Sequence, residues 1–473
     1  MIGHNCGFVV THTLHDAYSF IKSLQHRGRE AAGIAAIAND RIDVVKWLGK
    51  VERFDLKNLY KIFPGSSYNT FLAHVRYATR GKKDRLLEDA HPHVIGGRAE
   101  NRMDHKFILD CDAAIVINGQ TNESYFKVID LEKVVSECDS EKMLHYYAQR
   151  GINALMNEIP GAYTGAIADK KINGVFVFRD RLGMKPGVLG WKDGKYVAAS
   201  EDIAFKENGA QLTEDIEPGA IYFLDYAGDY KKQKIVGGPK RHCMFESQYL
   251  ADSNSLIDRI MPRNQRAMLG EELAEEFHPE GIDFVTFVPD CPVIAALSYH
   301  SKTGVPFKDI FYKVRKERSF QGSTRDERVA SINSNLHLSP HILDELRGKS
   351  ILIIEDSVVR GNVLSRVRQL VYDVAGVKKA YVASYTPPIG IIGEDGIARG
   401  CEFGVDMAAN DNFIARNRTV EQISAEAGID VYYLSMKGFE RAFERAGKKK
   451  EELCTYCIGG EHPFTRLTIK QTS

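Results

Sequence analysis

Runs of consecutive apolar residues mark the second half of the chain. Residues 351–354 read Ile-Leu-Ile-Ile, residues 284–288 are apolar apart from one Thr, and residues 380–383 form a third run. An apolar run without polar alternation is typical of a strand buried on both faces, as in a parallel sheet. Helical patterns lie between these runs, and this alternation of strands and helices predicts a parallel α/β sheet.

Short strands also recur through the first half, where glycines punctuate them. A helical segment near residue 24 leads into a strand near residue 33, and further predicted strands cover residues 6–10, 74–81, 113–119, 174–178 and 196–199. Short strands at close intervals predict a largely antiparallel sheet up to about residue 240. Residues 231–240 are polar and contain Gly and Pro, which predicts a linker between the two units.

Composition and charge argue against several classes of partner. The chain has 473 residues, 44% of them hydrophobic and 27% charged, and Lys plus Arg equals Asp plus Glu at 63 each. This balance gives no net attraction to nucleic acid or to an anionic membrane, and we expect neither as a partner. No apolar run approaches the roughly 18 residues of a membrane span. The first residues lack a basic segment followed by an apolar one, so we expect a cytoplasmic protein.

Two carboxylates stand directly after the apolar run at 351–354. Glu355 and Asp356 would emerge at the carboxyl end of the predicted strand, where open α/β sheets bind ligands. A short loop through Arg360 and Gly361 then enters a segment with apolar residues at helical spacing. A glycine-bearing loop before a helix is typical of an anion site, and paired carboxylates beside it suit a sugar phosphate with Mg²⁺. The residues alone leave an ordinary acidic loop equally open.

The same stretch resembles the ribose-phosphate signature of type I phosphoribosyltransferases, in the form found in the glutamine phosphoribosylpyrophosphate amidotransferase family. Glu355 replaces the family's first Asp, and Val363 lacks the hydroxyl of the family's Thr. The resemblance implies that Glu355 and Asp356 bind ribose hydroxyls and Mg²⁺. It also implies that Arg360 and Gly361 hold the 5-phosphate.

Four motifs of the first half resemble the glutaminase domain of N-terminal-nucleophile amidotransferases. They are Cys6-Gly7, the His-Arg-Gly of residues 26–28, the His-x-Arg-Tyr-x-Thr-x-Gly of residues 74–81, and Asn118-Gly119. The resemblance implies the αββα glutaminase fold, with Cys6 as the nucleophile. In this class the nucleophile must be the first residue, because its own α-amine takes the proton. Residues 1–5 would therefore be a propeptide.

The resemblance also assigns the groups that would bind glutamine. Asn118 and the Gly119 N–H would form the oxyanion hole, a donor type worth roughly 3–4 kcal/mol. Arg76 would hold the substrate α-carboxylate in a bidentate pair, and Asp139 would take the α-ammonium. Tyr77, where sister families carry Trp, points to the phosphoribosylpyrophosphate branch and joins the predicted substrate-binding residues. Without the resemblance, Arg76 and Asp139 would be read as surface ion pairs.

The cysteines of the second half form a further candidate site. Cys454 and Cys457 make a CxxC motif, which by spacing alone is compatible with redox chemistry, zinc or a cluster. Cys243 and Cys401 supply two more thiols, and four Cys suit either zinc or a [4Fe–4S] cluster. The iron–sulfur branch of the amidotransferase family carries ligands in these contexts, which favours the cluster. A scatter of buried thiols is the remaining interpretation.

The predicted organisation is a propeptide at 1–5, a glutaminase domain at 6–240 and a phosphoribosyltransferase-like domain with a cluster-binding segment at 241–473. The resemblance implies that ammonia from glutamine displaces pyrophosphate from phosphoribosyl pyrophosphate and gives phosphoribosylamine, the first step of purine biosynthesis. Two alternatives remain open, a sugar-phosphate or nucleotide sensor without synthase chemistry and a glutaminase that serves another acceptor. The expected partners are glutamine, phosphoribosyl pyrophosphate or a related sugar phosphate, and further copies of the chain.

The pyrophosphate loop departs from the family pattern. The family's Pro-Asp-Ser-Gly-x-x-Ala-Ala reads Pro-Asp-Cys-Pro-Val-Ile-Ala-Ala at residues 289–296. Pro292 removes a backbone N–H, and Cys291 is a poor ligand for Mg²⁺, which prefers oxygen. The basic segment expected after it, around Lys313, is also eroded. The sequence therefore predicts weak affinity for phosphoribosyl pyrophosphate and better retention of a ribose 5-phosphate group.

Overall fold

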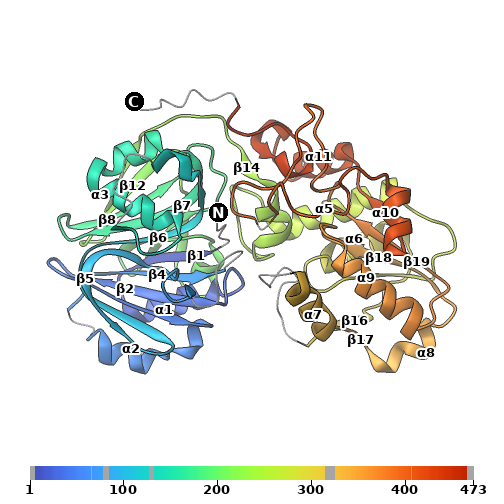
Figure 1. Ribbon diagram of the computed structural model, residues 1–473, viewed down its shortest axis with the longest axis horizontal. Helices are drawn as coiled ribbons and strands as arrows, with labels where there is room; N and C mark the ends of the chain where they lie inside the picture. The colour runs from blue at the N-terminus through green and yellow to red at the C-terminus, as the bar shows by residue number, and fades with distance from the viewer. Residues whose placement is uncertain are drawn as a thin grey trace.

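A computed structural model describes residues 6–64, 67–77, 85–126, 133–314, 325–405 and 407–465 of the chain. The first and second halves of the chain lie side by side (Figure 1), and near the end of the described chain Leu453–Cys454 pairs with His242–Cys243. The expected propeptide at 1–5 lies outside the described residues. Within the described part, no helix is both long and apolar enough to cross a membrane.

The first half is built on one large antiparallel sheet. The strand order is β11-β9-β10-β1-β4-β2-β3-β6-β7-β8-β12-β13, with β5 paired to β6. The strands are β1 (Gly7–Thr11), β2 (Ala31–Ile37), β3 (Ile42–Leu48), β4 (Thr70–Arg76), β5 (His93–Asn101), β6 (His105–Thr121), β7 (Gly161–Asp169), β8 (Gly174–Arg179), β9 (Val188–Lys192), β10 (Lys195–Ala199), β11 (Gln211–Asp215), β12 (Ala220–Asp225) and β13 (Tyr230–Lys234).

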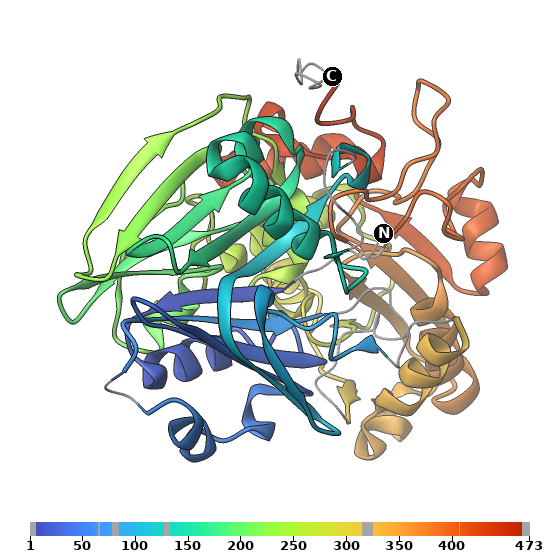
Figure 2. The same cartoon turned by 60° about the vertical axis from the view of Figure 1, so that its left-hand side comes forward.

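This sheet folds over on itself and is covered by helices on both outer faces. Side chains of β1, β2 and β4 pack against those of β6, β7 and β8 in a core between the two sheet layers. Helices α1 (Leu14–Ser23), α2 (Leu56–Ile62) and α4 (Ile203–Lys206) cover one outer face, and α3 (Asp139–Glu158) covers the other. Figure 2 brings this half forward. The helix–sheet–sheet–helix stack confirms the predicted αββα glutaminase fold.

The second half contains the predicted parallel sheet. Its order is β15-β18-β19-β20, and every pairing is parallel. The strands are β15 (Phe284–Phe287), β18 (Ser350–Glu355), β19 (Lys379–Ser384) and β20 (Asp430–Tyr433). Two small sheets accompany it, β14 (His242–Cys243) with β21 (Leu453–Cys454) and β16 (Phe311–Lys313) with β17 (Leu336–Leu338).

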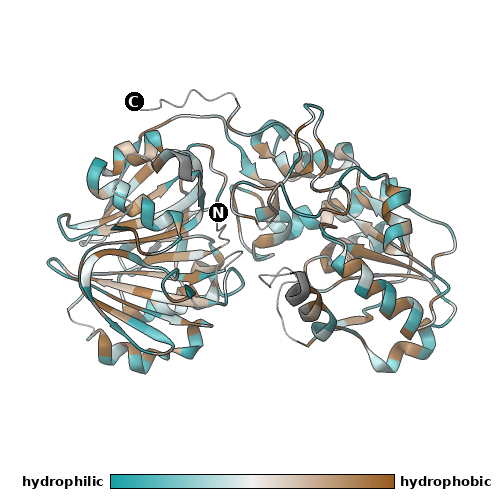
Figure 3. Ribbon diagram, in the orientation of Figure 1, coloured by the Kyte–Doolittle hydropathy of each residue, from teal (hydrophilic) through white to brown (hydrophobic). Residues whose placement is uncertain are grey.

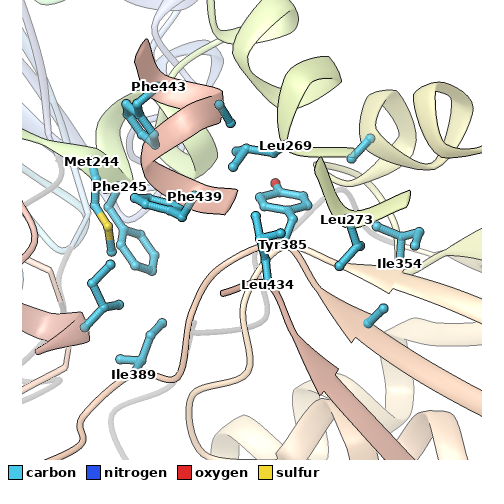
Figure 4. Packing of buried hydrophobic residues seen from close by; sticks show 14 of the residues in the cluster. Met244, Phe245, Leu269, Leu273, Ile354, Tyr385, Ile389, Leu434, Phe439 and Phe443 are labelled. Atoms are coloured by element: carbon cyan, nitrogen blue, oxygen red, sulfur yellow. The ribbon is translucent and has the colours of Figure 1, made fainter. Parts of the chain in front are cut away.

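Apolar residues of this parallel sheet pack against helices on both faces. One face meets α5 (Pro262–Glu276), α6 (Val293–Thr303) and α11 (Met436–Arg445), where Leu269, Ile354 and Phe439 come together (Figure 4). The other face meets α8 (Leu343–Leu346), α9 (Asn362–Arg368), the π-helix η7 (Gln369–Val374) and α10 (Val420–Ala427). Strands buried on both faces explain the continuous apolar runs, which colour brown in Figure 3.

The remaining helices are short or stand apart from both sheets. They are η1 (Val51–Arg53), η3 (Glu123–Phe126), η5 (Glu246–Leu250), α7 (Arg325–Asn335), η6 (Pro340–Ile342), η8 (Lys450–Glu452) and η9 (Tyr456–Ile458).

The predicted linker at 231–240 is partly wrong. Its first residues belong to β13, which forms an antiparallel hairpin with β12. The prediction failed here because a run of charged side chains resembles a solvated connector, as at Lys231, Lys232 and Lys234. They lie on an edge strand, where charged side chains are common because they discourage pairing with other chains. The connector begins only after Lys234.

Candidate active sites

Cys6 lies at the entrance to β1, in the middle of the large sheet. Gly7 pairs with Val75 on the neighbouring strand β4, which places Cys6 beside the end of that strand. The Cys6 side chain is buried, and the Arg27 Nε donates a hydrogen bond of 2.8 Å to its carbonyl oxygen. The backbone that carries the thiol is thus held by a sheet neighbour and by a buried guanidinium.

Burial raises the pKa of the Cys6 thiol to about 12. A hydrogen bond from the Tyr77 backbone and the charges of Arg76 and Arg27 oppose this shift without cancelling it. The thiol is therefore protonated at neutral pH while it sits in the intact chain. A reaction that uses Cys6 as nucleophile needs a base close to the sulfur.

Asn118 and Gly119 lie near the end of β6. The Asn118 side chain is fully buried, yet neither its Oδ1 nor its Nδ2 has a hydrogen-bond partner among the described residues. Such a group is costly to bury unless a ligand satisfies it. Gly119 has φ of 145°, and a Cβ there would lie 2.0 Å from the Ala162 carbonyl oxygen. Only glycine fits, so the direction of the Gly119 N–H is set by β7.

Arg76 and Asp139 are buried, which excludes the surface ion-pair interpretation. Arg76 is fully enclosed; its Nη2 lies 3.4 Å from Asp89 Oδ2, and its Nε has no partner among the described residues. Asp139 Oδ2 accepts hydrogen bonds from the Thr121 backbone N–H at 2.6 Å and from the Thr121 hydroxyl at 3.1 Å. Asp89 was not predicted from the sequence, because an isolated Asp in a polar stretch carries no motif.

A cavity of about 470 Å³ opens at the carboxyl end of β18. The predicted ribose-phosphate residues Glu355, Asp356, Arg360 and Gly361 all line it. Residues of the first half, His26 and Arg29, share its wall. The remaining lining residues are Tyr249, Ala251, Asp252, Ser253, Arg266, Pro289, Asp290, Cys291, Lys313, Ile332, Ser357, Val358, Val359, Asn362, Val363 and Leu364. A cavity of this size and position is typical of a small-molecule site.

The two cavity carboxylates that follow β18, Glu355 and Asp356, differ in their surroundings. Burial, together with the neighbouring charge of Asp356, raises the pKa of Glu355 well above its usual range, and Lys313 only partly offsets this. Glu355 Oε2 has no partner among the described residues, whereas Asp356 Oδ1 accepts a 2.8 Å hydrogen bond from the Ser357 hydroxyl. Arg360 Nη2 pairs with Asp411 Oδ2 at 2.6 Å, a contact that the sequence did not predict.

The loop that departs from the family's pyrophosphate pattern also borders the cavity, through Pro289, Asp290 and Cys291. The Cys291 Sγ lies 3.2 Å from the Gln248 carbonyl oxygen and 3.4 Å from the Tyr385 hydroxyl. Pro292 occupies the position just before α6, so the first turn of that helix lacks one N–H. Arg315 and residues 318–320, which would continue the basic segment expected around Lys313, lie outside the described residues.

The four cysteines of the candidate cluster come together at the small β14–β21 sheet. Cys243 pairs with Cys454 across this sheet. Burial raises the pKa of each of the four thiols, to about 12 for Cys243, and negative charge on neighbouring thiols adds to the shift at Cys243, Cys454 and Cys457. Over the described ranges, no group of three or more His, Cys, Asp or Glu side chains is arranged to hold a single metal ion.

Comparison with known proteins identifies the family. A glutamine amidotransferase domain family matches residues 105–207. The amidophosphoribosyltransferase of Archaeoglobus fulgidus is 32% identical over 459 residues, covering 95% of this chain and 94% of that protein. The chain belongs to the amidophosphoribosyltransferase family. The family enzyme of Methanothermobacter thermautotrophicus is 30% identical, covering 94% of this chain and 90% of that protein.

The family resemblance extends to the fold of both halves. The glutamine phosphoribosylpyrophosphate amidotransferase of Bacillus subtilis, solved with ADP and GMP, matches with a TM-score of 0.78 at 26% identity. The match covers 98% of this chain and 99% of that one. The expectation that a glutaminase fold and a phosphoribosyltransferase fold occur in one chain is confirmed. The Cys291–Pro292 departure therefore lies inside an otherwise family-like amidophosphoribosyltransferase framework.

Proposed function

We propose that this chain hydrolyses glutamine at Cys6 and uses the ammonia to displace pyrophosphate from phosphoribosyl pyrophosphate. The product would be phosphoribosylamine, at the first step of purine biosynthesis. The observation that carries this proposal is the cavity at β18, because His26 and Arg29 of the first half share its wall with Glu355 and Gly361 of the second. A cavity walled by both halves gives ammonia a destination beside the glutaminase.

The state of Cys6 supports removal of residues 1–5. A thiol with a pKa of about 12 needs a base, and the nearest one that chain cleavage can create is the α-amine of Cys6 itself. An α-amine with a pKa of ~8 can take the thiol proton and return it to the leaving ammonia. Asn118 and Gly119 would stabilise the oxyanion. Arg76 would hold the α-carboxylate, Asp139 the α-ammonium, and Tyr77 would line the same site.

The second half would hold Mg²⁺ and the sugar phosphate. Glu355 is a buried acid whose Oε2 lacks a partner among the described residues, and Asp356 stands beside it, so the donor set fits a hard divalent cation. Mg²⁺ bound there would neutralise charge on the pyrophosphate. Arg360 and Gly361 would hold the 5-phosphate, with Asp411 fixing the Arg360 guanidinium.

We further propose that Cys243, Cys401, Cys454 and Cys457 hold a [4Fe–4S] cluster. The donor set fits, because all four side chains are buried thiols. Cys243, Cys454 and Cys457 lie close enough to other thiols of the set for the charge of a neighbour to raise their pKa. Four thiolates can each bind one iron of a [4Fe–4S] cluster, and the iron–sulfur branch of the family that the sequence resembles carries cysteines in these contexts. The cluster would tie the C-terminal segment to β14. Iron analysis should give about four irons per chain, and Cys454→Ala should lose them while Cys111→Ala keeps them; stoichiometric zinc would contradict the proposal.

Separate measurement of the two products tests the function. Anaerobically prepared protein should release glutamate from glutamine, and pyrophosphate from phosphoribosyl pyrophosphate when glutamine is present. Glutamate without pyrophosphate would indicate a glutaminase that serves another acceptor. The absence of both products would favour the sensor alternative. This alternative stays the second candidate because Cys291 stands in the cavity wall and Pro292 follows it just before α6.

A further inference from the structure

The strand that carries the predicted oxyanion hole loses a neighbour just before the hole. On one edge β6 continues to pair with β7, with Ile117 opposite Gly165 and Asn118 opposite Thr164. On the other edge its pairing with β5 ends at Ile115, opposite His93. The chain turns away there through the cis peptide between His91 and Pro92. The backbone groups of Ile117 on this edge therefore need partners other than a strand.

Two stacked histidines supply those partners. The Ile117 N–H donates to His91 Nδ1 at 3.3 Å, and the Ile117 carbonyl oxygen accepts from His74 Nε2 at 2.9 Å. The two rings lie face to face with centroids 4.0 Å apart and planes inclined by 28°. Both side chains are buried. The imidazoles thus continue the sheet ladder where β5 has ended.

The backbone of Ile117 fixes the proton positions on both rings. An N–H only donates, so His91 Nδ1 is unprotonated; a carbonyl only accepts, so His74 Nε2 carries the hydrogen. Burial lowers the pKa of His74 to about 3, which keeps this ring neutral. With Nδ1 as acceptor, the neutral His91 carries its hydrogen on Nε2 and donates it to the Ser140 hydroxyl at 2.8 Å.

These contacts place His91 between the two ends of the glutamine site. Ile117 immediately precedes Asn118 of the predicted oxyanion hole, and Ser140 immediately follows Asp139, the predicted ammonium site. We propose that His91, stacked on His74, is a positioning residue that sets the separation between the oxyanion hole and the ammonium site. This inference rests on the proposed glutaminase function. It adds two groups that would act through the Ile117 backbone and, for His91, through the Ser140 hydroxyl.

The segment before His91 is itself firmly held. The buried Lys46 ammonium donates to the Ala90 carbonyl at 2.7 Å and to the Glu88 carbonyl at 3.0 Å. Gly33 lies against the same turn, where a Cβ would come within 2.2 Å of the His91 carbonyl oxygen. His93 meets the other side of the His91 ring, with centroids 4.5 Å apart. The backbone around His91 and the neighbouring His93 ring hold the His91 ring in place. A ring held in this way can set the separation between the oxyanion hole and the ammonium site.

A matched pair of substitutions separates hydrogen bonding from volume. His91→Gln keeps one acceptor and a donor on a flexible amide, whereas His91→Met has similar length and lacks both. In glutamine hydrolysis we expect kcat of His91→Met to fall about 100-fold, because a displacement near 1 Å at a catalytic group has an effect of that size. His91→Gln should stay within about fivefold of wild type, as expected when both hydrogen bonds survive. KM for glutamine should change much less than kcat.

Ammonium chloride supplied at pH 8.5 with phosphoribosyl pyrophosphate provides the internal control. This reaction bypasses Cys6, so both variants should run it at the wild-type rate. Affinity for glutamate γ-semialdehyde, whose hemithioacetal with Cys6 would place an oxygen in the hole, should fall in His91→Met in step with kcat. Affinity for glutamate should fall far less. A purely structural role would lower thermal stability without this selective loss.

The outcomes distinguish this inference from the proposed function. Wild-type protein that forms no glutamate would overturn both. An active wild type with equal kcat in the Gln and Met variants would overturn the positioning role alone. If His91→Met does not fold, Ser140→Ala tests the positioning role instead, because it removes only the hydroxyl that accepts the hydrogen bond from His91 Nε2. We expect kcat to fall several-fold with KM nearly unchanged, and an unchanged kcat would overturn the inference.

Discussion

The predicted glutamine site and the predicted phosphate cavity are built in opposite ways. The glutamine site is buried, and Cys6, Arg76 and Asn118 belong to or adjoin strands of one sheet. The predicted phosphate cavity has a volume of about 470 Å³, and the loops that follow β15 and β18 form part of its wall. The predicted glutamine site has little room for altered residues, because these three side chains are fully buried on or beside paired strands. The predicted phosphate cavity has Cys291 in its wall, and the next residue is Pro292, where the family pattern that the sequence resembles has Ser and Gly; residues of surface loops tolerate change better than core residues.

The sharpest test of the buried site is Cys6→Ala. Removal of the nucleophile should lower glutamine hydrolysis by at least about 10⁴-fold, as in other enzymes that lose a nucleophile. Intact mass should show that the variant keeps residues 1–5 while wild type begins at Cys6. Ammonium-supported turnover should persist, and Cys111→Ala, which removes a buried thiol elsewhere, should behave as wild type. Active wild-type protein that retains Met1 would contradict the propeptide proposal.

Gly119→Ala tests whether the sheet fixes the oxyanion hole. A Cβ would lie 2.0 Å from the Ala162 carbonyl oxygen, so β6 must shift and the N–H must turn. The expected loss in kcat is about 10²–10³-fold, the usual cost of one oxyanion donor. Gly237→Ala, where a Cβ meets nothing within 4 Å, is the matched control. Steady-state kinetics with near-normal activity in Gly119→Ala would show that this N–H is not used.

In the predicted phosphate cavity, we expect substitutions at Cys291 and Pro292 to raise the affinity for phosphoribosyl pyrophosphate. Replacing Cys291 by Ser and Pro292 by Gly restores a hydroxyl and a backbone N–H near the pyrophosphate position. Each contact to a charged group is worth roughly 1.5–3 kcal/mol, so affinity for phosphoribosyl pyrophosphate with Mg²⁺ should rise at least about tenfold. Affinity for a nucleoside monophosphate should not change. Calorimetric titration that already finds tight Mg²⁺-dependent binding in wild type would refute the predicted weakness.

The smallest expected effect is an acid sensitivity of the buried site. His74 has its pKa lowered to about 3, below the ordinary value of 6.5, so the folded state binds fewer protons than the unfolded state. The free energy of unfolding is therefore unaffected by His74 above pH 6.5, and it declines as the pH falls from 6.5 toward 3. At pH 5 the loss should be about 2 kcal/mol, from 1.36 kcal/mol for each pH unit. Comparing the denaturation of wild type and His74→Gln between pH 8 and 5 measures it, and identical pH profiles would contradict the assignment.

The sequence determined the elements and most of the candidate chemistry. The continuous apolar run at 351–354 predicted β18, and its following carboxylates do line a cavity. Local signals of this kind survive because a strand buried on both faces needs apolar side chains throughout. The motifs at Cys6 and Asn118 likewise identified groups that the fold buries. The connector at 231–240 failed because an edge strand and a solvated linker have the same polar composition.

Only the tertiary structure decided which distant residues act on these groups. Asp89 reaches Arg76, Asp411 reaches Arg360, and His91 reaches Ile117, and none of the three follows from local pattern. The state of Glu355 is likewise a property of the fold, because its raised pKa depends on burial and on Asp356. Periodicity reports which face of an element is buried, whereas side-chain partners and desolvation depend on how separate elements pack. That packing brings together residues that are far apart along the chain.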